Sequence, residues 1–533
     1  MSKQQQMILH PIMFALYPVA FLYTGHKNLF DFSVAFAPAL VTVLFSALIW
    51  LVIAKITGDW RRAAIPTSVL VLVFFSYSAV QRILTSFGSE GTLDLWSKLI
   101  GISIVAALAA AVIALRSAKN LGFVNYLLNV VSLFLVAGPL FQVGLGLFGA
   151  WSLQASIPDR AEFYANTLPK DAAASPDIYY LVLDGYARQD VLRDYFDYDN
   201  AEMIEALRQR GFAVADQAIA NYPYTLVSVN SSLNFSYLGE ILGDQLAASG
   251  DQRYLRQLMQ DSRAVRLLKQ AGYRIVSFES EYWGANIGGV DVNLKEWWFV
   301  NHFNFGVLQM TPLPTLLQAV GYTSLFDLHR VRTEYPFDHM DQALAIAGPK
   351  FVYSHVFFGH PPFVFGPNGE TVSSAGEYLW ETDANDETAK RDFVRGYRDQ
   401  ISYLNGRLLE TIDQIRANSK REPIIIIHGD HGAGLLYDEE SLDATDVAER
   451  YNIFYAAHLP DGGNEDIYPT MSPVNGLRIV FNRYLGTDYE LLEDRAYFAS
   501  QGRPYAYTPV PGLQGPRPEA QSSETVSVLT VDH

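Results

Sequence analysis

The first 150 residues contain five long apolar stretches that are separated by short polar segments. These stretches lie near 8–26, 34–54, 66–84, 99–115 and 122–148. Each is long enough to cross the roughly 30 Å hydrocarbon core of a bilayer as a helix. The pattern therefore predicts a transmembrane domain of five helices over residues 1–150, and it disfavours the buried helical bundle of a soluble protein.

Basic residues between these stretches alternate from one side of the predicted membrane to the other. They precede the first stretch and follow the second and the fourth, which is the pattern of loops that stay in the cytoplasm. The residues are Lys3, Lys55, Arg61, Arg62, Arg116 and Lys119. This placement predicts a cytoplasmic N-terminus, and five crossings then bring everything after Trp151 outside the cell membrane.

The second half of the chain alternates between two hydrophobic periods. Residues 177–183 form an almost continuous apolar run, which is typical of a strand buried on both faces. Similar runs occur at 273–278, 351–356, 423–428 and 453–457, and helix-period segments lie at 190–210, 252–271 and 388–417. The alternation predicts an α/β domain with a mostly parallel, helix-covered sheet.

The predicted α/β domain covers residues 177–500. A polar linker, 151–176, precedes it and is expected to tether the domain to the membrane. The C-terminal segment 501–533 is rich in Pro, Gly, Ser and Thr, so we expect an irregular tail.

The net charge of the 533-residue chain also changes sign between residues 1–150 and residues 151–533. Residues 1–150 carry nine Lys or Arg and four Asp or Glu, which leaves 30 basic and 52 acidic residues for 151–533. A total of −17 gives the chain no electrostatic footprint for nucleic acid, so DNA and RNA are excluded as expected partners. The absence of cysteine excludes disulfides, thiolate metal sites and a cysteine nucleophile.

One polar motif stands at the end of a strongly apolar strand. His428-Gly429-Asp430-His431-Gly432 follows four consecutive isoleucines. Carboxylate oxygen and imidazole nitrogen are ordinary ligands of zinc and manganese, and the flanking glycines permit a tight turn around an ion. Asp184 has the same setting after the strand at 177–183. The alternative for both is a polar turn that ends a strand.

Three further residues have side chains that suit phosphoryl chemistry. Thr225 stands where a helix over 226–236 is expected to begin, among free backbone N–H groups that can hold a phosphate while the hydroxyl attacks it. The alternative is a simple N-cap. His355 and His360 follow another strand, and either can be a metal ligand, a phosphate contact, a general acid or a structural histidine.

All of these strand-end residues are expected at one edge of the sheet. Ligands of open α/β sheets bind beyond the carboxyl ends of the strands. The residues predicted to meet there are Asp184, His355, His360, Asp430 and His431.

The order of these motifs resembles that of a known superfamily. Asp184-Gly185, Thr225, His360-Pro361 and Asp430-His431-Gly432 occur in the order of the alkaline phosphatase and sulfatase superfamily. With five spans before the α/β domain, the chain is most similar to its membrane-anchored branch, the lipoteichoic acid synthases and the phosphoethanolamine transferases that modify lipid A.

The resemblance implies roles for particular residues. One divalent ion, Mn²⁺ or Zn²⁺, would be held by Asp184, Thr225, Asp430 and His431. Thr225 would be the nucleophile, and His360 would contact the phosphate and act in catalysis. The further residues expected to bind substrate are His355, His360, Arg450 and Asn475.

Two departures from the superfamily limit the expected reaction and the expected number of metal ions. The nucleophile segment Thr225-Leu-Val-Ser-Val lacks the Cys/Ser-x-Pro-x-Arg motif of sulfatases, so hydrolysis of sulfate esters is not expected. Two-metal members have a ligand four residues before the position of His360, where this chain has Val356. One metal ion is therefore expected.

The resemblance implies a phosphotransferase in the bacterial cytoplasmic membrane, with its catalytic domain in the periplasm. It would move a phosphorylated head group from a phospholipid donor to an envelope glycan or glycolipid through a phospho-threonine intermediate. Two alternatives stay open: a phosphodiesterase or phosphatase that uses water as acceptor, and a non-catalytic scaffold in envelope assembly.

Overall fold

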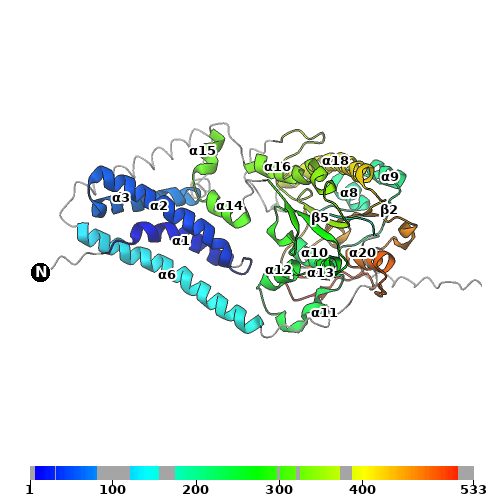
Figure 1. Ribbon diagram of the computed structural model, residues 1–533, viewed down its shortest axis with the longest axis horizontal. Helices are drawn as coiled ribbons and strands as arrows, with labels where there is room; N and C mark the ends of the chain where they lie inside the picture. Colours follow the sequence, from blue (N-terminus) through cyan, green and yellow to red (C-terminus); the bar gives the residue numbers. More distant parts are fainter. Residues whose placement is uncertain are drawn as a thin grey trace, which may run out of the picture.

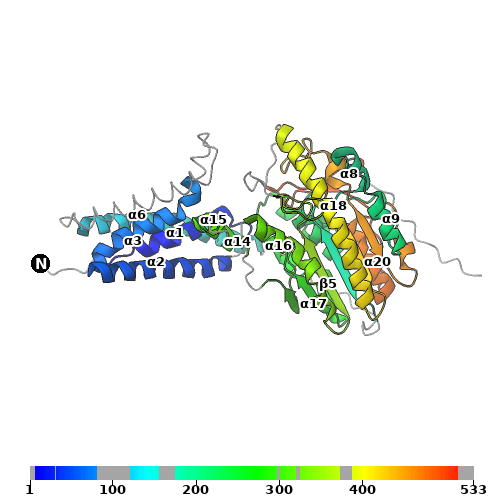
Figure 2. The ribbon, with the colours of Figure 1, turned by 90° about the horizontal axis from the view of Figure 1, so that it is seen from above.

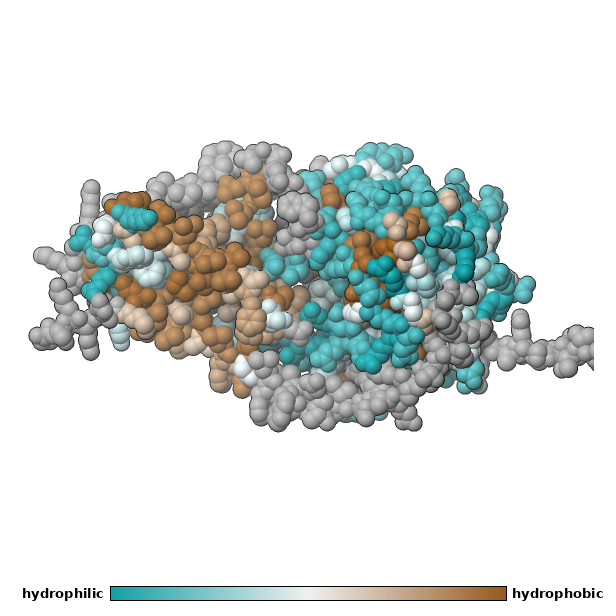
Figure 3. All heavy atoms as spheres, viewed as in Figure 1, coloured by the Kyte–Doolittle hydropathy of each residue, from teal (hydrophilic) through white to brown (hydrophobic). Residues whose placement is uncertain are grey.

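Two bodies lie along the long axis of the molecule, a helical bundle and a larger α/β domain (Figure 1). The computed structural model describes residues 7–30, 32–80, 121–154, 175–296, 301–319, 325–372 and 387–513. On the face shown in Figure 3, the bundle is mainly hydrophobic, whereas the α/β domain is mainly hydrophilic.

Four described helices form the bundle. They are α1 (His10–Gly25), α2 (Phe36–Thr57), α3 (Trp60–Phe75) and α6 (Leu121–Gln154). A polar contact joins three of them, because the buried His10 ring lies 2.6 Å from Ser68 Oγ through Nδ1 and 2.8 Å from Asn125 Oδ1 through Nε2. Such hydrogen bonds satisfy polar groups inside an otherwise apolar bundle.

The predicted count of five spans is not confirmed. Within the described residues, two helices have the length and hydropathy needed to cross a membrane, Phe32–Thr57 and Leu121–Leu145. The stretches at 8–26 and 66–84 correspond to α1 and α3, of 16 residues each. Helix α3 begins earlier than predicted because Asp59 caps it by accepting a hydrogen bond from Arg61 N. The stretch 99–115 lies outside the described residues.

A seven-stranded sheet forms the centre of the α/β domain, in the order β2-β7-β6-β1-β5-β3-β4. Its strands are β1 (Ile178–Leu183), β2 (Ala213–Val214), β3 (Arg274–Phe278), β4 (Val292–Leu294), β5 (Lys350–Val356), β6 (Ile424–Gly429) and β7 (Tyr455–His458). Strand β7 pairs antiparallel with β6 and β2, and the other pairs are parallel. The predicted mostly parallel sheet is confirmed.

The register brings the carboxyl ends of the three central strands together. Leu183 at the end of β1 pairs with Val356 of β5 on one side and with Gly429 of β6 on the other. The residues that follow these strands therefore emerge at one place on the edge of the sheet.

Helices cover both faces of the sheet (Figures 1 and 2). Alternate residues of β1 point to opposite faces, so Tyr180 packs with one set of helices and Tyr179 with the other. The first set is α10 (Thr225–Asn234), α12 (Arg253–Gln260), α13 (Arg263–Gln270) and α20 (Pro473–Val480). The second is α8 (Gln189–Phe196), α9 (Ala201–Gln209), α16 (Leu325–Asp338), α17 (Met340–Leu344) and α18 (Glu387–Asn418). The core therefore lies in two layers.

Two predicted helices are each divided in the structure. The segment 190–210 forms α8 and α9, because Asp197 ends α8 in the left-handed conformation at φ 50°. The segment 252–271 forms α12 and α13, with extended backbone at Ser262 between them. Hydrophobic period alone does not mark such short breaks.

The C-terminal segment begins with ordered pairing. Thr508–Pro509 (β9) pairs antiparallel with Tyr497–Phe498 (β8), so the first part of 501–533 belongs to the domain. Residues 514–533 lie outside the described part of the chain, as do residues 155–174 of the predicted linker.

The candidate metal centre

The site begins with the two turns that follow β1 and β6. Gly185 adopts φ +73°, and a Cβ there would lie 2.9 Å from the Gly359 carbonyl oxygen, so this turn requires glycine. The N–H groups of Gly185 and His431 donate to Asp430 Oδ1 at 3.1 and 3.0 Å. These bonds fix the Asp430 carboxylate. They leave its Oδ2 facing Asp184, His355 and His431.

Four sequence-predicted residues meet at this edge. His431 Nε2 lies 3.3 Å from Asp184 Oδ1, 3.5 Å from Asp430 Oδ2 and 3.2 Å from Thr225 Oγ1. Ligand atoms of Asp184, Asp430 and His431 all lie within 4.8 Å of one another, and the three residues are buried. The predicted set of metal ligands therefore converges on one point.

The two histidines of the cluster are oriented by hydrogen bonds from their outer nitrogens. His431 Nδ1 lies 2.9 Å from the Gly432 carbonyl oxygen, so Nδ1 carries the proton and Nε2 offers a lone pair to the cluster. Ser280 Oγ lies 2.9 Å from His355 Nδ1, and His355 Nε2 is 3.9 Å from Asp184 Oδ2 and 3.8 Å from Asp430 Oδ2. Such outer contacts are typical of histidines that bind a metal.

Several buried polar atoms of the cluster have no hydrogen-bond partner among the described residues. They are both carboxylate oxygens of Asp184, Oδ2 of Asp430 and Nε2 of His355. Buried polar groups are nearly always paired, and buried charges are paired or coordinate a metal. A divalent cation fits this set because it would satisfy the oxygens and the imidazole nitrogens together.

The electrostatics favour a cation in the same position. Burial, and then the negative charge of Asp430, raise the pKa of Asp184 well above its ordinary value. Burial also opposes ionisation of Asp430, but the neighbouring His431 and His355 outweigh it and lower the pKa. Burial and the charge of Arg450 lower the pKa of His431 to about 3, which keeps its ring neutral and able to ligate.

Thr225 is the first residue of α10 and does not act as its N-cap. The N-cap is Tyr224, in extended conformation, and its side chain makes no capping bond. The Thr225 hydroxyl instead points at His431 Nε2. The local geometry thus presents the hydroxyl to the metal cluster from the N-terminal end of a helix, where backbone N–H groups are free.

Arg450 lies behind the cluster and holds two of its segments together. Its buried guanidinium donates to the carbonyl oxygens of Pro223 at 2.6 Å and Gly432 at 3.0 Å, and it lies 3.9 Å from the Tyr437 ring centroid. These contacts join the segment before Thr225 to the turn that contains Asp430 and His431. Arg450 therefore positions both parts of the site.

The other two predicted substrate-binding residues, His360 and Asn475, lie in different parts of the domain. His360 follows β5, and its Nδ1 donates to the Pro361 carbonyl oxygen at 2.8 Å. Burial lowers its pKa to about 4, with Arg450 opposing protonation and the Pro361 contact and Asp430 favouring it. Asn475 instead bonds to Leu492, Tyr468 and Asp494, which are outside the cluster.

The sequence patterns did not identify two residues of the site, Ser280 and Ser228. Ser280, which orients His355, stands two residues after β3 and so follows the same strand-end rule as Asp184. Ser228 donates to the Asp430 carbonyl oxygen at 2.7 Å and lies three residues after Thr225, on the same side of α10. The strand-end rule and the helical spacing could have identified both.

No protein-family model and no curated protein matches the sequence. Among solved structures, the periplasmic domain of EptC from Escherichia coli is 12 % identical with a TM-score of 0.40, over 64 % of this chain and 96 % of that one. The integral membrane lipooligosaccharide phosphoethanolamine transferase A from Neisseria meningitidis is 12 % identical with a TM-score of 0.35, over 87 % and 93 %. The lipoteichoic acid synthase LtaP from Listeria monocytogenes is 13 % identical with a TM-score of 0.37, over 62 % and 77 %.

Both groups that the motifs resemble, the phosphoethanolamine transferases and the lipoteichoic acid synthases, are thus among the similar structures. Because these identities and TM-scores are low, the function of the chain is inferred from its own residues.

Proposed function

We propose that the chain is a membrane-anchored, metal-dependent phosphotransferase. It moves a phosphorylated head group from a phospholipid donor to an envelope glycan or glycolipid through a phospho-threonine intermediate. The observation that carries the proposal is the Thr225 hydroxyl at the N-terminus of a helix, directed at a buried cluster of two carboxylates and an imidazole. A purely structural role for Thr225 would not account for the buried carboxylate oxygens beside it that have no hydrogen-bond partner among the described residues.

One divalent ion, Mn²⁺ or Zn²⁺, would be held by Asp184, Asp430, His431 and Thr225. When bound, such an ion lowers the proton affinity of a hydroxyl and neutralises phosphoryl oxygens. His355 also directs Nε2 at both carboxylates, so we assign it to holding this cluster instead of to the substrate contact expected from the sequence.

Thr225 acts as the nucleophile in the first half of the reaction. Its Oγ1 forms a bond to phosphorus while the bond from phosphorus to the diacylglycerol oxygen breaks, and the hydroxyl proton is balanced by protonation of that leaving alcohol. In the second half, a hydroxyl of the acceptor attacks the phospho-threonine and the threonine hydroxyl is restored. The free N–H groups at the start of α10 stabilise charge on the phosphoryl oxygens.

His360 contributes a contact to the phosphoryl group. Its low pKa leaves the ring neutral near pH 7, and the proton on Nδ1 is directed to Pro361. A phosphate at Nε2 would favour the doubly protonated ring, because opposite charge raises the pKa of a histidine. The protonated ring can then stabilise the phosphoryl oxygens or protonate the leaving alcohol.

The position of the cluster relative to the bundle suits a lipid donor. Burial and the charges of Asp184 and Asp430 raise the pKa of Tyr282, so this residue lies within electrostatic reach of the cluster. Its neighbour Trp283 packs on Phe30, in the loop after α1, with 5.0 Å between ring centroids. The carboxyl edge of the sheet therefore faces the end of the bundle.

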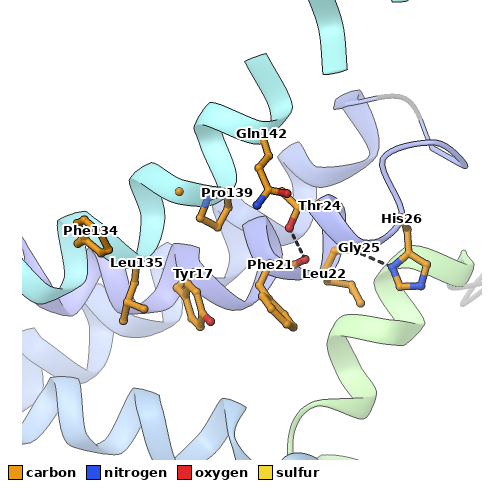
Figure 4. A pocket seen from close by; sticks show the side chains of 11 residues that line it. Tyr17, Phe21, Leu22, Thr24, Gly25, His26, Phe134, Leu135, Pro139 and Gln142 are labelled. Atoms are coloured by element: carbon orange, nitrogen blue, oxygen red, sulfur yellow. Dashed lines mark hydrogen bonds between the residues drawn. The ribbon is translucent and has the colours of Figure 1, made fainter. Parts of the chain in front are cut away.

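A groove on the bundle supports a lipid partner. It has a volume of about 470 Å³ and lies between α1 and α6 (Figure 4). Phe134 and Leu135 line one end, whereas Thr24, His26 and Gln142 line the other end. We assign the groove to an acyl chain of the donor, since an apolar wall with a polar end matches a lipid with its head group towards the catalytic domain.

A labelled phospholipid tests the proposal and separates it from its alternatives. The full-length chain is incubated with a donor labelled in its head group, with and without a glycolipid acceptor and with Mn²⁺ or Zn²⁺. We expect label on the acceptor and release of diacylglycerol. Label that appears only as free phosphorylated head group would favour a hydrolase, and absence of turnover under all conditions would favour the scaffold.

A further inference from the structure

An uncharged insert interrupts the acidic α/β domain between β4 and α16. No Asp, Glu, Lys or Arg occurs between Glu296 and Asp327, although residues 151–533 carry 30 basic and 52 acidic residues. The described part of the insert contains α14 (His302–Gln309) and α15 (Leu313–Ala319). These two helices lie beside the bundle in both views of the fold (Figures 1 and 2). The composition of the insert matches its neighbour and not its own domain.

Helix α14 packs directly on the bundle. Phe303 and Val307 are buried in one cluster with Tyr23 and Phe30. The ring centroids of Phe303 and Phe30 are 5.7 Å apart, and a Cβ at Gly306 would lie 3.1 Å from the side chain of Leu22. This close packing fixes the insert at the end of α1 that faces the catalytic domain.

Three leucines of helix α15 are partly exposed. Leu313, Leu316 and Leu317 are 39 %, 42 % and 38 % exposed, and their spacing places them on one side of a helix. The apolar surface of the bundle continues over α15 in the space-filling view (Figure 3). Apolar side chains grouped next to a bilayer-spanning surface mark a site of contact with lipid.

We propose that α14 and α15 form an interfacial helix pair, which places Leu313, Leu316 and Leu317 in the outer leaflet of the bilayer that holds the bundle. The occupant of this apolar surface is lipid. Charge supports it, because an uncharged helix face can enter the leaflet whereas the acidic remainder of the domain cannot. The inference rests on the membrane placement of the bundle and not on the proposed reaction.

The helix pair is also joined to the segment that orients His355 beside the metal cluster. The guanidinium of Arg332, on α16, lies 5.8 Å from the centroid of the Phe305 ring. Arg332 pairs with Glu281 at 3.6 Å, and Glu281 adjoins Ser280, which orients His355. Helices held in the leaflet would therefore set the height of the site above the lipid head groups.

The absence of cysteine makes a depth measurement direct. We would attach a spin label to Leu316→Cys in the full-length chain, reconstituted in nanodiscs of phosphatidylethanolamine and phosphatidylglycerol. Phe134→Cys, at an 81 % exposed position on α6, serves as the bilayer control. Lys420→Cys, in the exposed loop before β6, serves as the aqueous control. Relaxation by oxygen, which partitions into lipid, is compared with relaxation by a water-soluble nickel complex.

We expect the label at residue 316 to follow the label at residue 134, with strong relaxation by oxygen and weak relaxation by nickel. A label at 316 that behaves as the one at 420 would overturn the proposal. So would dipolar broadening at 316 that disappears on dilution with unlabelled chain, because a second copy would then cover the leucines. If the label at 134 is itself relaxed by nickel, the membrane placement fails and the inference fails with it.

Discussion

Two buried carboxylates face each other across a neutral imidazole at the centre of the candidate site. Asp184 has no hydrogen-bond partner for either oxygen among the described residues, and Asp430 has one oxygen fixed by two N–H groups. Without a cation, burial and then the charge of Asp430 oppose ionisation of Asp184, whereas the neighbouring histidines favour ionisation of Asp430. A site of this kind therefore lowers the stability of the metal-free protein.

The buried position of Asp184 gives Asp184→Asn two opposite effects on stability. In chelator the variant should be at least as stable as the parent, because the neutral amide replaces a buried carboxyl group whose ionisation is opposed by burial and by Asp430. With Mn²⁺ or Zn²⁺ at 100 times the dissociation constant, the parent should gain about 2.7 kcal/mol and the variant should gain little. Thermal unfolding with and without metal measures both effects.

Asp413→Asn is the matched control, since Asp413 is an exposed carboxylate paired with Arg210 at 2.7 Å. The metal-dependent gain should stay intact in that variant. If Asp184→Asn kept the full gain while Asp413→Asn lost it, Asp184 would not be a ligand.

Asn475 lies in a polar network that is separate from the metal cluster. Its amide accepts from Leu492 N and donates to Leu492 O, Tyr468 Oη and Asp494 Oδ1. Asn475→Ala should cost about 3 kcal/mol, because several buried polar groups lose their partner at once. Chemical denaturation measures the loss.

The folded fraction of Asn475→Ala should retain the KM of the parent for the lipid donor. Asn418→Ala, which removes an exposed amide that donates to Gln414 O, should leave stability unchanged. A variant at 475 with normal stability and a raised KM would instead support the substrate contact expected from the sequence.

At the scale of single elements, two glycines of α6 test the groove. A Cβ at Gly138 or at Gly144 would meet nothing within 4 Å, so both positions have room for a larger side chain. Gly138 lines the groove, whereas Gly144 does not. Gly138→Phe should fill the groove and raise the KM for a two-chain phospholipid by roughly tenfold, which corresponds to about 1.4 kcal/mol.

Gly144→Phe should leave that KM unchanged and serves as the control for a large ring on α6. A water-soluble donor without acyl chains should be turned over equally by both variants. Equal effects of the two substitutions on the lipid donor would remove the groove from the proposal.

Elements with continuous apolar runs can be predicted from the sequence. Breaks within helices and the orientations of side chains cannot. The strand that ends at Asp184 and the one that ends at Asp430 were visible because a buried parallel strand must be apolar on both faces. The ring direction of His355 depends on its contact with Ser280, 75 residues away, and no local pattern reports it. Asn475 has the same difficulty, because its partner Asp494 lies outside its helix.

At the scale of the whole molecule, the position of the basic residues sets the orientation. Lys55 and Arg61 flank the turn between α2 and α3, at the opposite end of α2 from the loop that touches Trp283. A reporter fused after Gly58 should be located in the cytoplasm, and one fused after residue 160 should be located outside. Activity of a reporter that folds only outside the cytoplasm distinguishes them, and a cytoplasmic location at 160 would refute the periplasmic catalytic domain.

The proposed reaction requires that Thr225 becomes covalently phosphorylated by the donor. The most direct test is mass spectrometry of the peptide containing Thr225, after the metal-loaded, full-length chain is incubated with a phospholipid and quenched in acid. We predict a mass increase equal to the phosphorylated head group at Thr225, and none in Asp430→Asn or Thr225→Ala. Turnover should fall on the order of 10³-fold or more in Thr225→Ala. An unmodified Thr225 during turnover, or an alanine variant with the activity of the parent, would contradict the account.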